Sequence, residues 1–292
     1  MYRAAIAITL AEVLITTAAI SQEVAYRDTN PSISPNGKYV AFYSDRSGND
    51  DEYLLELETG QMRRLTDSPL DEYGPAWSPD SRFVYFYRGE QGRFEVFRVD
   101  IGVGSTAERV TALGGYVGNP DISPSGREML VSWNQGIAGN DYEVFVVDLE
   151  TSALTQLTDN DANEYTPTWS PDGSMIAFNS NRDGEQFDVW VMEASGRNPR
   201  KLVDLHAHDY YTSWTPDGQW VAFFSGPDFD SFDAYKVHLE TGEVVRLTEG
   251  LGAGKVSFSS DGGFMILGAD HTEGGRLFRG TPDGTDLKLL LQ

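Results

Sequence analysis

The stretch Ser170–Phe178, SPDGSMIAF, occurs in six closely similar copies along the chain. The other copies are SPNGKYVAF (34–42), SPDSRFVYF (78–86), SPSGREMLV (123–131), TPDGQWVAF (215–223) and SSDGGFMIL (259–267). The second residues of the copies, at positions 35, 79, 124, 171, 216 and 260, are 44 to 47 residues apart. A period of that length indicates one repeated supersecondary unit, and four short strands per unit is typical of a propeller blade. The repeats therefore predict an all-β fold, a six-bladed β-propeller of four-stranded antiparallel blades.

The second repeat shows the four expected strands most clearly. They cover residues 74–77, 82–88, 94–100 and 108–113, which are rich in Val, Phe, Tyr and Trp and are bounded by turn residues. Proline before Asp-Gly presets φ for a tight turn, and glycine supplies a positive φ. A large apolar residue stands two positions before each marker and is expected to pack between blades: Ile33, Trp77, Ile122, Trp169, Trp214 and Phe258. Six complete repeats suit ring closure by packing of blade 1 against blade 6 without an exchanged strand, and the alternative is that residues 23–27 add a strand there.

The first residues differ from the repeats in composition. Residues 1–21 carry Arg3, then an apolar run interrupted by Glu12, then small residues that suit cleavage near Gln22. This pattern predicts a secretory signal, followed by one propeller domain over residues 22–292. No second apolar segment is long enough to span a membrane. We therefore expect a periplasmic or secreted protein with no membrane span after removal of the signal.

The composition narrows the classes of partner and chemistry. The chain has 45 Asp plus Glu against 22 Lys plus Arg, a formal net charge of −23, and no cysteine. A field of that sign repels phosphate backbones, which argues against nucleic acid as a partner. The lack of cysteine excludes a thiolate nucleophile, a thiolate metal site and a redox motif. The acidic excess is explained by a solvated surface, and it also suits cations, basic proteins or amine-bearing ligands.

The repeats carry a family resemblance. The element SPDGxxIAF, the tryptophan before it, the loop SDRSGNDDEY (44–53) and the RLT of the fourth strand (64–66) together resemble the PD40, or WD40-like, repeats of the TolB-like family. The resemblance covers all six repeats. It implies a six-bladed propeller exported to the bacterial periplasm that binds a protein partner in the cell envelope. TolB itself has a further domain before its propeller, whereas here a short segment separates the predicted signal from the first repeat, so the resemblance implies a TolB-like propeller.

Candidate functional residues gather where the fourth strand of one blade leads to the first strand of the next. Seven positions before the markers stand Asp28, Glu72, Val117, Glu164, Asp209 and Ala253. The four acids are expected at the mouth of the central channel, together with the neighbouring Asp71 and His208. Loops on a rigid scaffold commonly carry function. The predicted ligand-binding residues are therefore Asp28, Asp71, Glu72, Glu164, His208 and Asp209.

Converging carboxylates at a channel mouth raise one another's pKa or recruit a cation. Oxygen ligands alone would suit Ca²⁺ or Mg²⁺, and histidine would favour Mn²⁺ or Zn²⁺. The candidate metal ligands are Glu72, Glu164, His206, His208 and Asp209. The alternative is that these acids hydrogen-bond the loops of neighbouring blades, an interpretation that we weigh slightly above the metal.

A second set of acids starts the third strand in five blades: Glu52, Glu95, Glu143, Asp188 and Asp233. A feature shared by most blades is more typical of scaffold than of a site. We expect these acids to pair with loop residues such as Arg46 or Arg182.

The motifs favour a binding protein over an enzyme. The sequence has no G-x-S-x-G elbow, no P-loop and no H-E-x-x-H. The leading hypothesis is an exported, non-catalytic scaffold that presents an acidic channel mouth to a protein or peptide. The alternative is a metal-assisted lyase or hydrolase acting on carbohydrate, because some propellers resembling this one are pectin-degrading lyases. A third hypothesis is a module stabilised by Ca²⁺.

Overall fold

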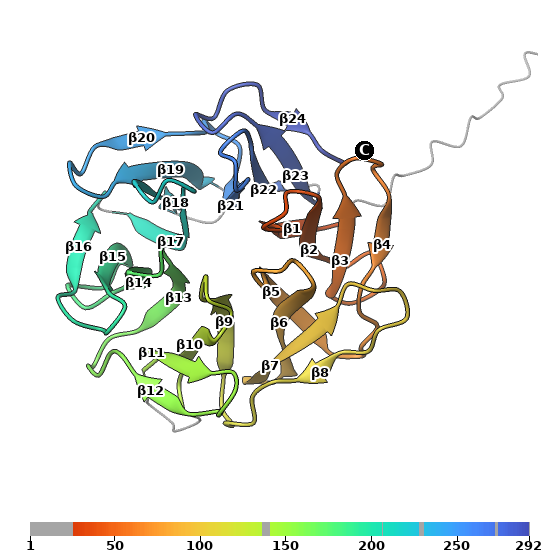
Figure 1. The fold of residues 1–292 in the computed structure, drawn as a ribbon. Coiled ribbons are helices and arrows are strands. Elements are labelled where there is room, and N and C mark those ends of the chain that lie inside the picture. Colours follow the sequence, from red (N-terminus) through yellow and green to blue (C-terminus); the bar gives the residue numbers. More distant parts are fainter. Residues whose placement is uncertain (1–25, 136–140, 206, 228–230, 272–273, 292) are drawn as a thin grey trace, which may run out of the picture.

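The computed structural model describes residues 26–135, 141–205, 207–227, 231–271 and 274–291. In these residues, 24 strands form six antiparallel sheets of four strands, arranged as the blades of a ring (Figure 1). Each sheet consists of four strands that are consecutive in the sequence. The predicted six-bladed β-propeller is therefore confirmed. The predicted signal, residues 1–21, lies outside the described residues.

The strands of successive blades occupy equivalent places. The first, innermost strands are β1 (Asp28–Ile33), β5 (Asp71–Trp77), β9 (Val117–Ile122), β13 (Glu164–Trp169), β17 (His208–Trp214) and β21 (Ala253–Phe258). The second strands are β2 (Tyr39–Ser44), β6 (Phe83–Glu90), β10 (Glu128–Trp133), β14 (Met175–Ser180), β18 (Trp220–Gly226) and β22 (Met265–His271). The third strands are β3 (Asp51–Glu56), β7 (Arg93–Asp100), β11 (Glu143–Asp148), β15 (Asp188–Glu193), β19 (Asp233–His238) and β23 (Gly274–Gly280). The outermost strands are β4 (Met62–Arg64), β8 (Glu108–Arg109), β12 (Leu154–Gln156), β16 (Arg200–Val203), β20 (Val244–Arg246) and β24 (Lys288–Leu289).

The strand bounds in blade 2 differ from those expected. The innermost strand begins at Asp71, three residues before the expected start, and the outermost strand ends at Arg109, four residues before the expected end. Beyond Arg109, the N–H groups of Val110 and Thr111 both donate to the carbonyl of Val96. The Thr111 hydroxyl accepts from the Val96 N–H. The threonine side chain thus replaces the next step of the ladder, which ends the strand.

The repeated motif forms the turn between the first and second strands. In blade 4, the Ser170 hydroxyl donates to Oδ1 of Asp172 (2.6 Å) and accepts from the N–H of Met175 (2.9 Å). The N–H of Ser174 also donates to Oδ1 of Asp172. These hydrogen bonds hold the pKa of Asp172 below its usual range. Gly173 adopts φ 73°, which is the left-handed region that favours glycine.

Replacing Gly173 with alanine should lower the free energy of unfolding by about 1 kcal/mol, because an L-residue is strained at this φ. The new Cβ would meet Pro124 only at ordinary contact distances, so crowding adds little. Urea denaturation measures the change. The matched control is Gly184→Ala, where the backbone has no positive φ and no atom lies within 4 Å. Equal effects at the two positions would contradict this account of the turn.

Large apolar residues fill the spaces between the blades. The indole of Trp77 donates to the Ser32 carbonyl of the preceding blade, and that of Trp214 donates to the Thr168 carbonyl in the same way. Trp169 is buried among residues of blades 3 and 4. The expected packing of these residues between blades is confirmed. The continuous interblade core holds the ring rigid.

The ring closes between blades 1 and 6 by side-by-side packing. Ile33 of β1 packs against Ile266 and Leu277 of blade 6, and its N–H donates to the Ser257 hydroxyl (2.9 Å). Within the described residues, blades 1 and 6 share no strand. Blades 1 and 6 therefore pack face to face, and residues 23–25 of the segment that offered the alternative strand lie outside the described residues.

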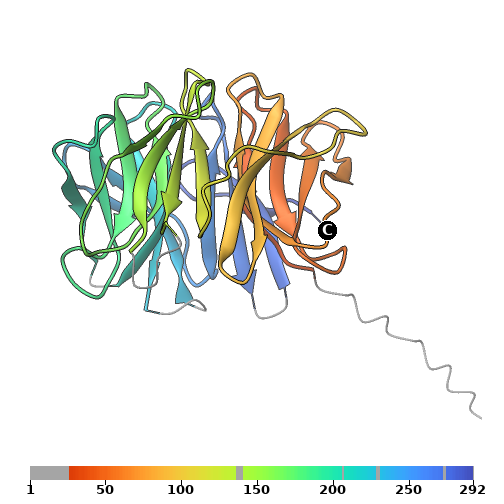
Figure 2. The same ribbon diagram turned by 90° about the horizontal axis from the view of Figure 1, so that it is seen from below.

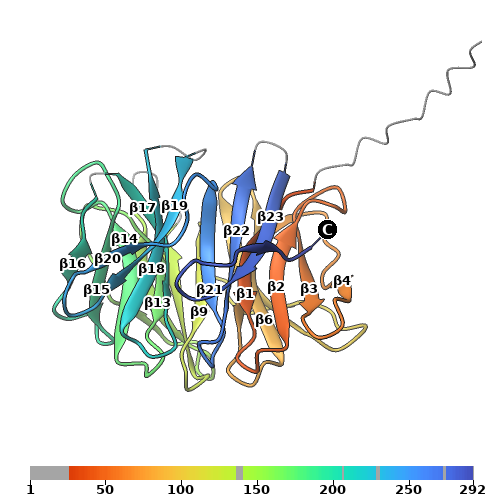
Figure 3. The same cartoon turned by 90° about the horizontal axis from the view of Figure 1, so that it is seen from above.

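The two ends of the ring are built from different loops. The loops between second and third strands, and those from the fourth strand to the next blade, emerge at one end (Figures 2 and 3). We call this end the mouth. The turns between first and second strands, including the repeated SPDG turns, lie at the opposite end.

Candidate functional site at the mouth of the propeller

The four acids lie at the first or second residue of an innermost strand, and their side chains are buried. Glu72, Glu164 and Asp209 have no exposed surface, and Asp28 has 8%. The N–H of Glu164 donates to the Tyr142 carbonyl of the preceding blade, and that of Asp209 donates to Phe187 in the same way. These positions therefore lie at the seams between blades.

Three of the four acids are bound to arginines of their own blades. Asp28 pairs with Arg46 (2.5 Å), and Glu164 pairs with Arg182 (3.0 Å). Burial raises the pKa of Glu72, and its neighbours Thr66 and Arg88 oppose that effect.

Glu72 also has several partners. Its carboxylate accepts from the Arg88 guanidinium at 2.5 Å and from the Thr66 hydroxyl. Arg46, Arg88 and Arg182 expose only 17%, 17% and 18% of their side chains. The three ion pairs are thus mostly buried within the blades, and a small part of each arginine side chain is exposed to solvent.

Each of these arginines also lies against an aromatic pair formed by the second and third strands. The guanidinium carbon of Arg88 is 4.5 Å from the ring centroid of Phe97. The corresponding distances are 4.8 Å from Arg182 to Trp190 and 5.1 Å from Arg46 to Tyr53. Cation–π attraction adds to the ion pair in this geometry. We call the repeated unit of acid, arginine and aromatic pair the acid–arginine unit.

Asp209 has no arginine. In the described residues, neither of its carboxylate oxygens has a hydrogen-bond partner of normal geometry. Burial raises its pKa to about 7, although the adjacent Ser225 hydroxyl is close enough to oppose the rise. The nearest cation in its surroundings, Lys201, is bound to Asp188 at 2.7 Å. A buried carboxylate that lacks a partner is costly when it is charged.

The remaining predicted residues face other neighbours. Asp71 accepts from the N–H of Asp50 (3.3 Å). His208 stacks on Tyr210, with centroids 5.7 Å apart, and its Nδ1 accepts from the N–H of Phe187 (3.4 Å). Successive strand residues point to opposite faces, so His208 and Asp209 project apart. His206 lies outside the described residues.

The predicted metal set can be tested against these contacts. Glu72 and Glu164 already hold arginines, which compete with any cation for the same oxygens. No three His, Asp or Glu side chains in the described part of the chain are grouped as metal ligands. Of the described carboxylates of the set, Asp209 is the one without an arginine partner, and the metal set stays a prediction.

The acids of the third strand do not pair with Arg46 or Arg182, so that prediction was wrong. They pair instead with basic residues of the outermost strand: Arg109 with Glu95, Lys201 with Asp188, and Arg246 with Asp233. In blade 1 the equivalent acid is Asp51, bound to Arg64, and not Glu52. The outermost strand runs beside the third strand, so its basic residue reaches the acid before a loop arginine can.

Glu143 and Glu164 approach each other between blades 3 and 4. Burial, with the neighbouring Glu164 as a further cause, raises the pKa of Glu143 to about 7. The Glu143 carboxylate also accepts from the N–H of Asn160 (2.7 Å). A carboxyl group with a pKa near neutrality can donate or accept a proton under physiological conditions.

An arc of aromatic rings runs around the mouth from blade 2 to blade 5, and the sequence interpretation missed it. Consecutive ring centroids lie 4.7 to 6.2 Å apart. The arc comprises Tyr73, Phe94, Tyr116, Tyr142, Tyr165, Phe187 and Tyr210. All seven are half-buried. The signal was an aromatic residue directly before each third-strand acid in blades 2 to 5, which reads as strand composition until the blades are joined.

The loops around this arc are acidic. Their described parts contain eight exposed acidic side chains, and the exposed basic side chains at this end, Arg93, Arg109 and Arg246, stand at the ends of the adjoining strands. The acids are Asp45, Asp67, Asp159, Asp161, Asp183, Glu185, Asp204 and Glu249. The mouth thus combines a strongly negative field with half-exposed rings on a rigid support.

Inside the channel, a small polar cavity of about 30 Å³ lies between the innermost strands. Asp121 of blade 3 and Lys255 of blade 6 line it together with Tyr211. Burial raises the pKa of Asp121 to about 7 and lowers that of Lys255, and each group opposes the shift of the other. A cavity of this size has room for ordered water and for little more.

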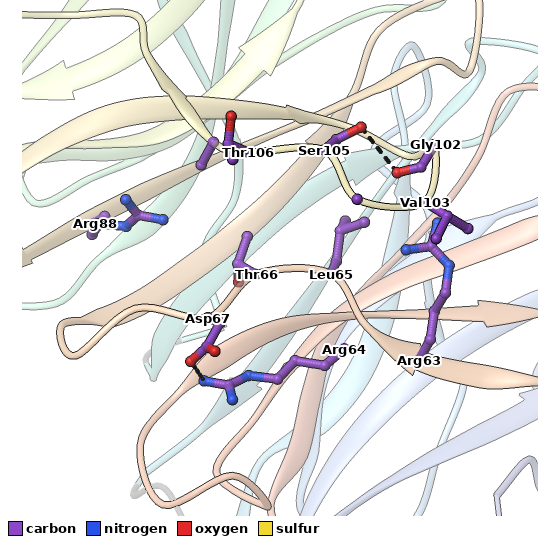
Figure 4. Close-up of a pocket in the computed structure, with 12 residues that line it drawn as sticks. Arg63, Arg64, Leu65, Thr66, Asp67, Arg88, Gly102, Val103, Ser105 and Thr106 are labelled. Carbon is purple, nitrogen blue, oxygen red and sulfur yellow. Dashed lines mark hydrogen bonds and ion pairs between the residues drawn. The ribbon is translucent and has the colours of Figure 1, made fainter.

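A larger cavity of about 570 Å³ lies between blades 1 and 2 (Figure 4). Arg63, Arg64 and Arg88 line it, opposite the β7–β8 loop with Val103. Arg64 is bound to Asp51 and Asp67, and Arg88 to Glu72. Arg63 donates to the Ile101 carbonyl. These arginines are engaged, so the cavity is not an evident anion site.

The fold defines the class of protein, a six-bladed β-propeller of four-stranded antiparallel blades. Comparison with known families then makes the assignment specific. The family model of the TolB β-propeller domain (PD40) matches residues 5–139 and 115–291. The chain therefore belongs to the TolB β-propeller (PD40) family, as the resemblance indicated.

Solved structures share the fold at low sequence identity. The putative TolB from Agrobacterium tumefaciens is 20% identical, with a TM-score of 0.71 over 82% of this chain and 87% of that one. An oligogalacturonate lyase in complex with manganese is 19% identical, with a TM-score of 0.61 over 92% of this chain and 78% of that one. Identities this low show the fold alone.

A curated relative gives a partial match. The uncharacterized peptidase YuxL of Bacillus subtilis (strain 168) is 26% identical over 155 residues, which are 52% of this chain and 22% of that protein. The match thus spans about a fifth of the length of the relative. In the described residues, no helix is long and apolar enough to cross a membrane.

Proposed function

We propose that the protein is an exported, non-catalytic scaffold of the periplasm whose mouth binds a protein or peptide partner in the cell envelope. The observation that carries this proposal is the aromatic arc surrounded by acidic loops. Tyrosine and phenylalanine supply contact area at low cost in conformational entropy, and they are enriched at protein interfaces. The opposite end of the ring consists of repeated tight turns.

The predicted ligand-binding residues support this proposal because three of them hold the structure around the mouth in place. Asp28, Glu72 and Glu164 tie loops and strands together through their arginines, which fixes the positions of the surrounding rings. Preorganised surfaces lose less entropy on binding. Membership of the TolB β-propeller family is consistent with a periplasmic location and a protein partner.

Photo-crosslinking in the producing cell tests this function. A photoreactive amino acid at the exposed mouth position Asp159 or Asp183 should yield a discrete crosslinked protein. The matched controls are the exposed positions Glu58 and Glu150 in turns at the opposite end. Crosslinking that is absent, or equal at both ends, would argue against a mouth that binds a protein.

The alternative function is a metal-assisted lyase or hydrolase acting on carbohydrate. Two observations favour keeping it: the carboxyl groups of Glu143 and Asp209 have pKa values of about 7, and an oligogalacturonate lyase with manganese shares the fold. The paired arginines on Glu72 and Glu164 count against the ligand set that this function would need.

Thermal unfolding with EDTA, and then with Ca²⁺, Mg²⁺, Mn²⁺ or Zn²⁺, separates the two functions. The scaffold proposal predicts no shift specific to one metal. A cation held at about 100 times its Kd would stabilise the fold by about 2.7 kcal/mol, which for a domain of this size raises the Tm by roughly 5 °C or more. Such a shift with Mn²⁺ or Zn²⁺ would favour the enzyme, and one with Ca²⁺ would indicate a structural ion.

A further inference from the structure

The acid–arginine unit is complete in three blades and incomplete in one. In blades 1, 2 and 4, the acid of the innermost strand, an arginine and an aromatic pair of the second and third strands occur together. Blades 3 and 6 lack the whole polar part, because Val117 and Ala253 replace the acid. Blade 5 alone keeps the acid, Asp209, and the aromatic pair, while the arginine is missing.

The strand register shows which residues of blade 5 stand where blades 1, 2 and 4 carry the arginine. Glu72 lies opposite Arg88 in the ladder, and Asp209 lies opposite Ser225. In blades 1 and 4, the residues opposite the acids are Ser44 and Ser180, and the arginine follows two positions later. In blade 5 that later position is Pro227. Neither place in blade 5 carries a cation.

The aromatic side of the unit is intact in blade 5. Phe223 and Tyr235 face each other across the ladder with centroids 5.8 Å apart and planes at 21°. The pair Phe86–Phe97, on which Arg88 lies in blade 2, has centroids 6.2 Å apart and the same angle of 21°. The ring pair that receives a guanidinium elsewhere is therefore preserved.

The Asp209 carboxylate has the surroundings expected in an acid–arginine unit that lacks its arginine. Asp209 is fully buried, and its oxygens have no charged partner and no hydrogen bond of normal geometry in the described residues, with only the Ser225 hydroxyl close by. Removing one partner of a buried ion pair leaves a costly charge. Blades 3 and 6 avoid this cost by having an apolar residue at the acid position, whereas blade 5 does not.

We propose that Asp209, Phe223 and Tyr235 form a socket for the guanidinium group of an arginine side chain supplied by the binding partner. This inference rests on the proposed function and names the partner chemistry that blade 5 recognises. In the complete units the arginine keeps 17% to 18% of its side chain exposed, so a guanidinium in the equivalent seat of blade 5 would reach the mouth, whereas Asp209 without one is fully buried. The acidic loops attract a cationic segment towards it.

The test uses N-acetyl-arginine N-methylamide as the probe, and the uncharged citrulline analogue as its control. At about ten times its Kd, the arginine probe should raise the Tm of the wild-type protein by about 3 °C, and the citrulline analogue should not. Asp209→Asn should abolish the shift. Ca²⁺ or Mg²⁺ that stabilises the protein through Asp209, in place of the arginine probe, would overturn the proposal.

Two variants keep the test decisive. Arg182→Ala opens the equivalent seat in blade 4, where the geometry of the bound guanidinium is known, and the probe should restore part of its lost Tm. Pro227→Arg supplies the missing arginine from the chain, and it should raise the Tm and remove the response to the probe. Rescue of Arg182→Ala without any response of the wild type would overturn the socket. Mouth crosslinking that persists in that case would leave the proposed function intact.

Discussion

Replacing Arg88 with methionine lowers the free energy of unfolding by about 3 to 5 kcal/mol, which is the expected cost of removing one partner of a buried ion pair. Methionine keeps the contact with Phe97 but leaves Glu72, which has no exposed surface, without its cation. Burial already raises the pKa of Glu72 with Arg88 present. Without the arginine that pKa rises further, so the loss of stability grows as the pH increases.

Urea denaturation at pH 8 measures this change. The matched control is Arg82→Met, which breaks the pair with Asp100 on the surface, where Arg82 exposes 64% of its side chain. Surface pairs contribute about 0 to 1 kcal/mol, so the control should change little. The double variant Arg88→Met with Glu72→Leu should recover most of the loss, because it leaves no buried charge. Equal effects of Arg88→Met and Arg82→Met would contradict the buried-pair account.

The contrast between these two arginines shows how far the sequence could predict the site. The period of the SPDG turns predicts six blades, and the position seven residues before each marker predicts which acids lie at the mouth of the central channel. Neither pattern shows that the Glu72 side chain points away from the channel and into its own blade. That orientation follows from the ladder register of Glu72 with Arg88, and register depends on where the innermost strand begins.

The third-strand acids illustrate a second limit. Arg182 and Lys201 are both close to the blade 4 acids in the sequence, so the sequence does not show which of them pairs with Asp188. The order of the strands in the sheet decides this. Lys201 stands on the strand beside Asp188, whereas Arg182 returns from the loop to Glu164. The aromatic arc has the same origin, because Tyr142 and Tyr165 meet only across the seam between two blades. Contacts within one repeat join residues that are close in the sequence. Contacts between repeats form only in the assembled ring, so the pattern of a single repeat does not predict them.

Replacing Asp209 with asparagine should stabilise the protein at high pH, by up to about 4 kcal/mol at pH 8. Burial raises the pKa of Asp209 from 3.8 to about 7, a difference of about three pKa units. The native state therefore binds this proton more tightly than the unfolded state does. The wild type loses stability as the pH rises from about 4 to about 7, and asparagine removes this loss because it does not ionise.

Unfolding at pH 4, 6 and 8 checks the sign as well as the size of this effect. The two proteins should have similar stability at pH 4, where Asp209 is protonated in the native state and only partly ionised in the unfolded state, and should differ most at pH 8. Glu164→Gln is the matched control: it should destabilise at pH 8, because Arg182 then loses a buried partner. Destabilisation by Asp209→Asn at pH 8 would mean that the carboxylate is already paired, and blade 5 would then need no arginine from outside.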